Sequence, residues 1–450
     1  MKTILIPIFQ GAESRSILRT EIFQKLRAVS GIRIVLLVPN EEKKKYFGSE
    51  FFGDNVVYEV VKNFQGNFFD KAFTFLRKNL VRTNTLRLKR KQDFLLGGNA
   101  VKYFFECIFS FIFGRKMCRK AVRWIDQNLI PEKGAQKIFD TLIPDIVLTA
   151  HIFGDMEASI LKEAKKRRIK TIGLINSWDK ITSRGMVRVI PDKLIVHNDT
   201  IKDEAVRFID MSPDSVFVLG IPQDDAFFSF YPKDKEKFFG SLGISTEKRI
   251  LLICPMGKTY SDVDADIINV VTNFKAQGRI PDDLAILVRF PPNDNIDVSL
   301  LRNKDLLVWE QPGVRFESTR GIDWDMTEID VQRLAYTLHC SAMVICPPSS
   351  ISVDAAIFDT PIINIRFERY DREKLNINAY YEMDHYRAIA KTGGIRFVQD
   401  ENELLLWINR YANDRKLDRI GRKEIVRQQC QFLDGKSSFR IANFVLDSLG

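Results

Sequence analysis

The sequence has little of what marks several common classes of protein. It contains four histidines and six cysteines in 450 residues. No cysteines form a C-x-x-C pair and no two histidines have metal-ligand spacing, so we expect no metal site. No window offers the ~20 consecutive apolar residues of a membrane-spanning helix. Residues 1–7 contain a short apolar run but lack a small-residue cleavage site, which is typical of a first strand and not of a signal peptide. We therefore expect a soluble protein of a reducing, cytoplasmic compartment.

What the sequence does have is length, apolar content and positive charge. Its 450 residues exceed the ~250–300 that a single core usually reaches, so two domains are expected. Hydrophobic residues make up 45%, which is ordinary for a globular protein. The net charge is +10, and part of the excess lies between residues 71 and 123. There a basic stretch, RTNTLRLKRK, is followed by KYFFECIFSFIFGRKMCRK.

A basic stretch beside a Phe-rich stretch indicates an anionic partner, either a membrane surface or nucleic acid. Residues 103–114 are too few to span a bilayer. They could lie in a membrane interface, with contact through residues 101–123, or form a core helix packed on the first sheet. No segment resembles a nucleic-acid-binding module, so we expect no nucleic-acid partner.

Apolar strand-like runs alternate with amphipathic helical segments along both halves of the chain. This pattern predicts an α/β fold with parallel sheets covered on both faces. We expect a first domain over 1–222 with a basic, Phe-rich helical insertion at about 67–130, a linker over 223–246, a second domain over 247–416, and closing helices over 417–450. The expected strands are 3–9, 32–39, 56–61, 145–151, 170–176, 192–198, 215–222, 249–256, 284–292, 343–350, 361–367 and 395–399.

The segment CPPSSISVDAAIFDTPIINI (346–365) is the clearest candidate for a ligand site. A buried strand ends at Pro347-Pro348, and Ser349 or Ser350 would cap the helix that follows. The free N–H groups and the positive end of that helix favour a phosphate. Asp354, about one turn further, could accept hydrogen bonds from ribose hydroxyls. The alternative is an ordinary capped helix with an exposed carboxylate.

This segment resembles the donor-nucleotide site of GT-B glycosyltransferases and of the related CDP-glycerol glycerophosphotransferases and UDP-N-acetylglucosamine 2-epimerases. In those families a Glu usually holds the ribose, whereas here Asp354 is one methylene shorter. The C-terminal DGKSSFRIANFVLDSL resembles the crossing helix of that fold. The resemblance implies two Rossmann-like domains facing a central cleft, C-terminal crossing helices, a nucleotide-linked substrate, and no further cofactor or metal.

Further donor-site candidates follow from that fold. Gly257 would allow close approach to a phosphate and Lys258 would supply charge, although both fit an ordinary strand-to-helix turn. Arg289, at a strand end, resembles the phosphate-binding basic residue of the superfamily, or forms a surface ion pair. The complete set of expected donor contacts is Gly257, Lys258, Arg289, Pro348, Ser349, Ser350, Ser352, Asp354 and His385.

The first half supplies candidates for acceptor binding and catalysis. Trp178, Asp179 and Arg184 lie in a loop after an apolar strand, where open α/β sheets bind ligands. Asp179 is the favoured general base, with His151 and Glu13 as the others; a capping Asp and a buried, hydrogen-bonded His are the structural alternatives. We expect Gly11, Trp178 and Arg184 to contact the acceptor. The loop at Gly11 is not a G-x-G-x-x-G motif, so no nicotinamide cofactor is expected.

These expectations combine into a glycosyltransferase that moves a sugar from a nucleotide-sugar donor to a carbohydrate or lipid-linked acceptor in cell-surface polysaccharide synthesis. It would work in the cytoplasm, peripheral to the inner face of the cell membrane. The alternatives are a CDP-linked polyol-phosphate transferase of the teichoic-acid type, a sugar-nucleotide 2-epimerase, and a non-catalytic module that binds a nucleotide or a membrane.

Overall fold

The computed structural model describes residues 1–61, 68–130, 134–259, 261, 263–294, 296–316, 323–367 and 377–450. These residues form two compact units, one of residues 1–225 and 431–450, the other of residues 226–430. The division at 225 falls inside the segment expected as a linker. Of the expected closing segment 417–450, residues up to 430 belong to the second unit, and the rest return to the first.

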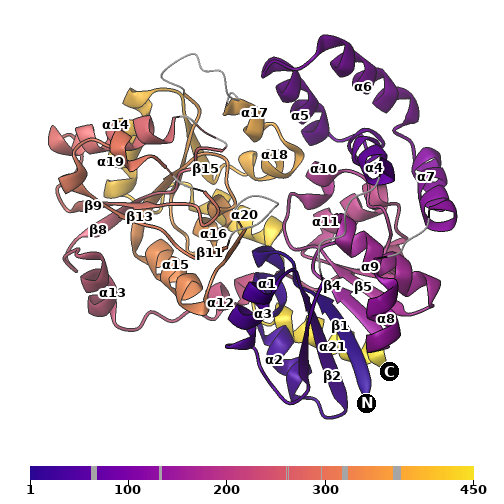
Figure 1. Ribbon diagram of the computed structural model, residues 1–450. Helices are drawn as coiled ribbons and strands as arrows, with labels where there is room; N and C mark the ends of the chain where they lie inside the picture. Colours follow the sequence, from indigo (N-terminus) through magenta and orange to yellow (C-terminus); the bar gives the residue numbers. More distant parts are fainter. Residues whose placement is uncertain are drawn as a thin grey trace. The chain divides into compact units, whose positions relative to one another are not determined.

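The first unit is built on a seven-stranded sheet with the order β3-β2-β1-β4-β5-β6-β7 (Figure 1). All of its strand pairs are parallel. Successive residues of a strand enter different cores, as Leu5 packs in one apolar cluster and Ile4 and Ile6 pack in another. This explains the continuous apolar runs, because both faces of the sheet are covered. Its strands are β1 (Lys2–Pro7), β2 (Ile32–Val38), β3 (Val56–Val60), β4 (Ile146–Thr149), β5 (Lys170–Leu174), β6 (Lys193–Val196) and β7 (Val216–Val218).

Several helices of the first unit start at side chains that accept hydrogen bonds from free backbone N–H groups. The Asn40 side chain, for example, accepts a hydrogen bond from the N–H of Lys43, and that of Asn198 accepts one from Ile201. The C-terminal helix α21 packs on the sheet with Ile441 and Val445. The helices are α1 (Gly11–Ile17), α2 (Glu21–Ala28), α3 (Glu41–Gly48), α4 (Phe68–Asn79), α5 (Asn84–Leu95), α6 (Ala100–Phe113), α7 (Lys116–Leu129), α8 (Gln136–Leu142), α9 (Asp155–Lys166), α10 (Lys180–Arg184), α11 (Asp199–Glu204) and α21 (Ser437–Leu449).

The second unit repeats the design with a six-stranded parallel sheet of order β10-β9-β8-β13-β14-β15, and adds an antiparallel pair, β11 and β12. The predicted class, α/β with two Rossmann-like halves, is confirmed. The strands are β8 (Arg249–Ile253), β9 (Leu284–Arg289), β10 (Leu307–Glu310), β11 (Val314–Phe316), β12 (Asp323–Asp325), β13 (Ser341–Cys346), β14 (Ile362–Ile365) and β15 (Ile395–Val398). The helices are α12 (Asp225–Phe228), α13 (Lys235–Leu242), α14 (Asp264–Ala276), α15 (Glu328–Cys340), α16 (Ile351–Ile357), α17 (Asn378–Tyr381), α18 (Asp384–Ala390), α19 (Glu401–Asn413) and α20 (Arg419–Gln429).

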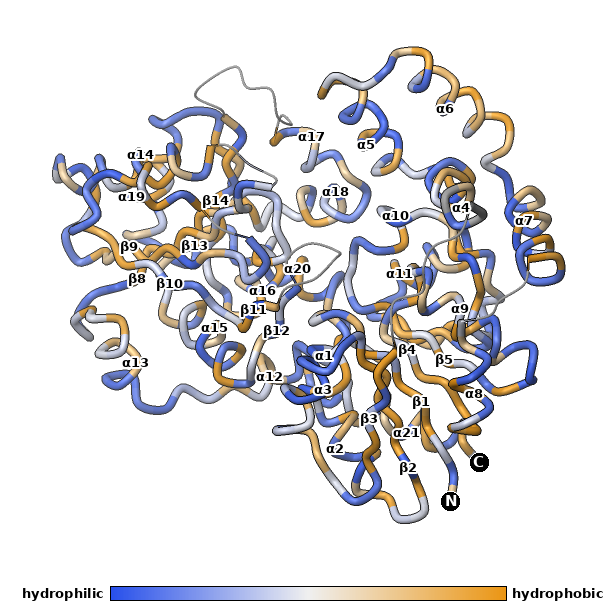
Figure 2. The backbone as a smooth tube through the Cα atoms, in the orientation of Figure 1, coloured by the Kyte–Doolittle hydropathy of each residue, from blue (hydrophilic) through white to orange (hydrophobic). Residues whose placement is uncertain are grey.

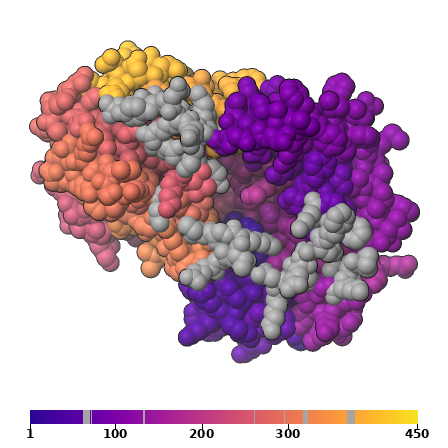
Figure 3. Space-filling model, turned by 45° about the horizontal axis from the view of Figure 1, so that its top comes forward, coloured from indigo at the N-terminus to yellow at the C-terminus, as the bar shows by residue number. Residues whose placement is uncertain are grey.

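The helices α4–α7 lie between β3 and β4 in sequence and form the insertion of the first unit. The interpretation of residues 103–114 as a core helix is wrong, because α6 is apolar along its length but largely exposed (Figure 2). Only Ser110 of α6 is buried. In the space-filling view the purple atoms of the insertion form part of the surface of the first unit (Figure 3). Among the described residues, no helix is both long and apolar enough to cross a bilayer.

Candidate functional site

Each sheet has one point where the strand order reverses, and ligands of open α/β sheets bind beside such points at the carboxyl ends of the strands. In the first unit the point lies between β1 and β4, and in the second between β8 and β13. The loops that follow these four strands, taken with the helices α1 and α16 into which two of them lead, contain most of the residues expected from the sequence. The two sets of candidates are described separately, since each belongs to its own unit.

In the second unit, the loop after β8 is fixed by two buried carboxylates. The N–H groups of Met256 and Gly257 donate to Asp264, at 3.2 and 2.8 Å, and the N–H of Thr259 donates to Asp294 at 2.8 Å. Gly257 has φ +91°, and a Cβ there would lie 2.5 Å from that of Asp294. Glycine is therefore required by the loop itself. Its N–H is used by Asp264, whose pKa burial raises to about 6. The exposed Lys258 follows directly.

The loop after β13 leads into α16 and carries the expected phosphate and ribose contacts. The hydroxyl oxygen of Ser349 accepts from the N–H of Ile351 at 3.4 Å, and the carbonyl of Ser350 accepts from Val353 at 2.8 Å. Pro348 and Ser349 are half-buried and Ser350 is exposed. Asp354 is also half-buried. The pKa of the Cys254 thiol, just after β8, is raised chiefly by burial and in part by the charge of Asp354, so the two side chains lie near each other. The second turn of α16 thus lies beside the reversal point.

Ser352 faces the interior of the second unit and is fully buried. Its hydroxyl is 2.8 Å from that of Tyr386, which donates to Asn364 at 2.6 Å. The Asn364 amide in turn donates to the carbonyl of Cys346 at 3.0 Å. This buried chain of hydrogen bonds links α16, α18, β13 and β14. The geometry therefore gives Ser352 a structural part in holding α16, in place of the expected donor contact.

Arg289, at the end of β9, is likewise engaged within the second unit. It is buried and forms an ion pair with Glu310 at the end of β10. Arg333 of α15 contacts the same carboxylate at 2.5 Å. Of the two interpretations from the sequence, the ion pair accounts for this arginine, although it is buried and not on the surface. His385 is half-buried in the first turn of α18.

In the first unit, the loop after β1 is organised by Glu13, which is buried together with Glu157 of α9. The N–H groups of Phe9 and Gln10 donate to the Glu13 carboxyl. Burial and the neighbouring Glu157 raise the pKa of Glu13 well above its ordinary value. Its burial also separates this carboxyl from solvent, unlike the half-buried carboxylate of Asp179. Gly11, the first residue of α1, is also buried.

His151 follows β4 and is also buried, with its ring 5.9 Å from that of Phe153. Asp179 follows β5 and is half-buried, immediately before α10. Its two carboxylate oxygens accept from the hydroxyls of Ser177, at 2.5 Å, and Ser183, at 3.0 Å. These bonds fix the carboxylate in one orientation. Among the three candidate bases, Asp179 combines access to solvent with a fixed orientation.

The loop of residues 175–188, which contains Trp178, Asp179 and Arg184, is held by the insertion. Trp178 packs partly against the core, and Arg184 is exposed. Thr83, between α4 and α5, donates to the carbonyl of Thr182 at 2.7 Å. Lys89 of α5 donates to that of Ser183 at 3.3 Å, and Arg123 of α7 to that of Val187 at 2.9 Å.

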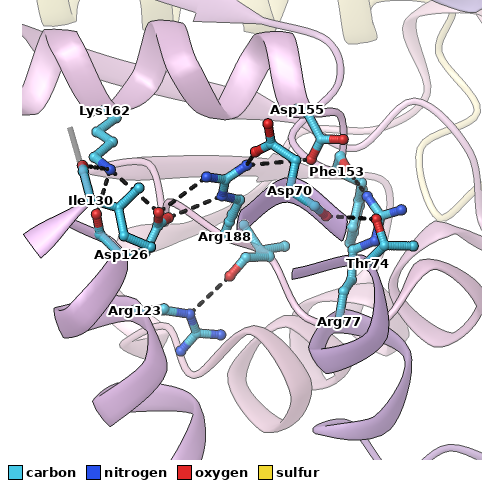
Figure 4. A network of polar contacts seen from close by, with 11 residues as sticks. Asp70, Thr74, Arg77, Arg123, Asp126, Ile130, Phe153, Asp155, Lys162 and Arg188 are labelled. Carbon is cyan, nitrogen blue, oxygen red and sulfur yellow. Dashed lines mark hydrogen bonds and ion pairs between the residues drawn. The ribbon is translucent and has the colours of Figure 1, made fainter. Parts of the chain in front are cut away.

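Arg188, the last residue of this loop, is the centre of an ionic network with the insertion (Figure 4). Its guanidinium contacts Asp126 of α7 twice, at 3.1 Å, and Asp70 of α4 at 2.7 Å. The Asp126 carboxylate is fully buried and also lies 3.3 Å from Lys162 of α9. Figure 4 shows Asp126 between Lys162 and Arg188. The insertion and the candidate loop are therefore one connected structure.

The sequence did not indicate the residues that hold the candidate site through contacts distant in the chain, which are Asp264, Asp294, Glu310 and Tyr386. It also gave no role to Lys180, although this residue directly follows Asp179 in a strand-end loop. Lys180 is buried, and its charge lies within electrostatic reach of Asp179, Glu13 and Glu157. Across the described ranges, no group of three or more His, Cys, Asp or Glu side chains is placed to hold a metal ion.

Comparison with known proteins places these features in a family context. The family model described as CDP-Glycerol:Poly(glycerophosphate) glycerophosphotransferase matches residues 180–447, more than half of the chain. Curated protein sequences give no significant match.

Solved structures are similar in fold at low identity. The UDP-GlcNAc 2-epimerase from Methanocaldococcus jannaschii has a TM-score of 0.56 and 12% identity, with 99% of this chain and 100% of that chain covered. The enzyme from Neisseria meningitidis bound to UDP-GlcNAc has a TM-score of 0.55 and 10% identity, at 99% and 100% coverage. The wall teichoic acid polymerase TagF, in a variant with one histidine replaced by asparagine, has a TM-score of 0.52 and 12% identity, at 100% and 89%. The GT-B class expected from the sequence is thereby confirmed.

Proposed function

Since the chain belongs to the CDP-glycerol:poly(glycerophosphate) glycerophosphotransferase family, we propose that it transfers a polyol phosphate from a CDP-linked polyol to a hydroxyl group of a lipid-linked acceptor. The observation that carries this proposal is the family match itself. The matched residues 180–447 include α10 in the first unit and both loops at the reversal point of the second. Family membership favours this reaction over the sugar transfer that the sequence led us to expect.

The donor would bind at the reversal point between β8 and β13. Asp354 would accept hydrogen bonds from the ribose, and Ser349, Ser350 and Lys258 would lie by the diphosphate. The support is positional: Asp354 lies near Cys254 at the end of β8, and Ser350 and Lys258 are exposed at the ends of neighbouring strands. Gly257 would act indirectly, by allowing the conformation of the loop that carries Lys258.

In the transfer step, the acceptor oxygen forms a bond to the phosphorus that carries the polyol. The bond from that phosphorus to CMP breaks, and CMP leaves with the bonding electron pair. The acceptor hydroxyl gives up its proton, and we assign its removal to Asp179, whose carboxylate is held by Ser177 and Ser183. A positioned general base typically contributes 10²–10⁴-fold in rate.

A second candidate is the transfer of a sugar from a nucleotide sugar. It is favoured by the chemistry of the donor site, because Asp354 and the start of α16 would serve the ribose and phosphates of any nucleotide donor. The GT-B fold is also compatible with it. The two candidates differ in the bond that breaks, which is a P–O bond in the first and a C–O bond at the sugar in the second.

The insertion would bring the protein to an anionic membrane surface. The exposed apolar side chains of α6 and α7 form an apolar face, flanked by the exposed Lys102, Arg115, Lys116 and Lys120. Apolar side chains beside cations are typical of helices that lie in the interface of anionic bilayers. The apolar face consists of Val101, Phe104, Phe105, Ile108, Phe111, Ile112, Phe113, Met117, Trp124, Ile125 and Leu129, which are 43–83% exposed.

Donor choice is tested by thermal unfolding of the purified protein with CDP-glycerol, CDP-ribitol, CMP, UDP-GlcNAc and GDP-mannose. A ligand that binds only the folded protein raises the melting temperature. We expect stabilisation by the cytidine compounds, and its loss in Asp354→Asn. The control is Asp282→Asn, because Asp282 is 99% exposed and precedes β9 at the opposite edge of the same sheet. Stabilisation by UDP-GlcNAc or GDP-mannose alone would favour the second candidate, and an effect of Asp282→Asn equal to that of Asp354→Asn would remove Asp354 from the site.

Membrane contact is tested by flotation with vesicles of phosphatidylglycerol and phosphatidylcholine. We expect binding that rises with the fraction of phosphatidylglycerol and falls strongly in the double variant Phe104→Ser/Phe111→Ser. The matched control is Leu406→Ser/Ile420→Ser in the second unit, where the two side chains are 51% and 87% exposed. Equal loss of binding in both double variants would contradict the assignment to the insertion.

A further inference from the structure

The first unit contains a group of cations at the carboxyl edge of its sheet. Among the described residues, no carboxylate forms an ion pair with them. We infer that Lys180 and Arg184 of α10, with Lys89 of α5 and Arg77 of α4 beside them, form a binding site for a phosphate-bearing group. All four cations belong to the first unit, whereas the donor loops belong to the second. Its assignment to the acceptor rests on the proposed function; its preference for phosphate rests on the geometry alone.

Lys180 is the core of this site. Its side chain is almost entirely buried, at 9% exposure for the residue, yet its Nζ makes no hydrogen bond or ion pair with any described residue. The nearest carboxylate in sequence, Asp179, is directed to Ser177 and Ser183. Burial and the charge of Arg184 lower the pKa of Lys180. An ammonium group buried without an ionic partner is unfavourable, and a bound anion would relieve that cost.

The acids within electrostatic reach of Lys180 are Asp179, Glu13 and Glu157. Of these, Glu13 is itself buried beside Glu157, and burial and the charge of Glu157 raise its pKa. The Asp179 carboxylate faces more than one cation, since its charge acts on Lys89 as well as on Lys180.

Arg184 connects Lys180 to two further cations, because its charge acts on Lys180, Lys89 and Arg77 alike. Arg184 is exposed, and within the described part of the chain its guanidinium has no hydrogen-bond partner. Lys89 donates only to the carbonyl of Ser183, at 3.3 Å. Arg77 donates to the carbonyl of Phe153 at 2.7 Å, while its buried Nε lacks a partner among the described residues. Burial lowers the pKa of both Lys89 and Arg77, and the charge of Arg184 lowers both further. Asp155 acts on Arg77, and Asp93 on Lys89.

The structural arginines of the same unit have a different environment. Arg119 and Arg123 both pair with Asp210, at 2.5 and 2.7 Å, and Arg188 pairs with Asp126 and Asp70. Each of these buried guanidinium groups therefore has a carboxylate. The contrast indicates that the cations around Lys180 are arranged for a partner that the chain does not supply.

A phosphate group fits this arrangement. An arginine can donate two parallel hydrogen bonds to phosphate oxygens, and a lysine adds a compact charge. The site lies where β5 ends and α10 begins, at the sheet edge that binds ligands in this architecture. The phosphate could belong to a polyol-phosphate acceptor or to a lipid headgroup. Asp179 lies within the same cluster, so a bound acceptor phosphate would place a nearby hydroxyl beside the assigned base.

The test is isothermal titration of the purified full chain with sn-glycerol 3-phosphate, without donor, so the result does not depend on transfer. We expect binding by the wild type, affinity reduced about tenfold in Arg184→Gln and in Lys180→Gln, and affinity retained in Lys180→Arg. Arg184 is exposed, so Arg184→Gln should fold normally, as the melting temperature will verify. The control is Lys166→Gln. Lys166 is exposed at the C-terminal end of α9, and we expect this variant to bind like the wild type.

Two comparisons fix the location and the source of the phosphate. If Lys258→Gln in the second unit abolishes binding while Arg184→Gln and Lys180→Gln bind like the wild type, the inference is overturned. It is also overturned if Lys166→Gln weakens binding as much as Arg184→Gln does, because the attraction is then unspecific. If only phosphatidylglycerol vesicles bind, and Arg184→Gln reduces that binding relative to Lys166→Gln, the site stands with a lipid headgroup as its ligand. Absence of any such difference with both probes would refute it.

Discussion

Replacing Arg188 by methionine should destabilise the first unit more than any surface change, because it breaks a buried ionic network. The Arg188 side chain is 12% exposed and the Asp126 carboxylate 0%. Methionine would leave Asp126 with Lys162 alone, at 3.3 Å, and would remove the contact to Asp70. Breaking one side of a buried pair typically costs about 3–5 kcal/mol, since the remaining charge stays buried. For a unit of this size, that corresponds to roughly 6–20 °C in the melting temperature.

The assay is differential scanning calorimetry of the full chain, with hydrogen exchange to assign the transition of the first unit. Lys165→Met is the control in the same unit, because Lys165 contacts Asp192 at 2.9 Å and the two side chains are 33% and 48% exposed. Exposed pairs contribute about 0–1 kcal/mol. If Arg188→Met lowers the free energy of unfolding no more than Lys165→Met does, the reasoning is refuted.

A double-mutant cycle isolates the interaction itself. We expect Arg188→Met and Asp126→Leu to be less destabilising together than the sum of the two single changes, by about 1 kcal/mol or more. Additive effects would mean that the two side chains stabilise the unit independently, in conflict with the contacts in Figure 4.

Three further predictions concern other sites. The buried His197 has a pKa lowered to about 4 by burial, so the free energy of unfolding should fall by about 3 kcal/mol as the pH drops from 6.5 to 4; urea titrations of His197→Leu should lack this part of the loss. Gly257→Ala should destabilise the second unit by roughly 1–3 kcal/mol because Gly257 has a positive φ. Its control, Gly240→Ala, lies in α13 with open space around it and should be neutral or stabilising by up to about 1 kcal/mol. The reverse order of stability in calorimetry would contradict the structural role given to Gly257. Tyr386→Phe should cost about 1–3 kcal/mol and should speed hydrogen exchange in α16, which a merely local effect on α18 would leave unchanged.

The strands could be predicted because each is a run of apolar residues buried on both faces. Every run expected from the sequence corresponds to a strand, with differences of a few residues at the ends. The strands β10, β11 and β12 were missed, since they are short and contain polar residues such as Glu310 and Asp323. The exposed position of α6 could not be derived, because a Phe-rich helix of this length suits a core as well as a membrane interface.

The sequence could predict the position of a candidate residue only where its place in the chain, shortly after a strand, determines the sheet edge at which it lies. Residues that directly follow strands, such as Asp179 and Ser350, lie at the expected edges of the sheets. Side-chain direction depends on partners that are distant in sequence. Ser352 turns inward to Tyr386, 34 residues later, and Arg289 pairs with Glu310, 21 residues later. No local pattern contains that information.

The most direct test of the central claim uses CDP-glycerol with ³²P in the phosphate next to glycerol, and a short glycerol-phosphate oligomer on a lipid as acceptor. The account predicts that the label moves to the acceptor with release of one unlabelled CMP per transfer. It also predicts that Asp179→Asn lowers the rate about 100-fold or more, while Asp282→Asn does not. A label that stays in CDP-glycerol while a UDP- or GDP-sugar is consumed, or an unchanged rate in Asp179→Asn, would contradict it.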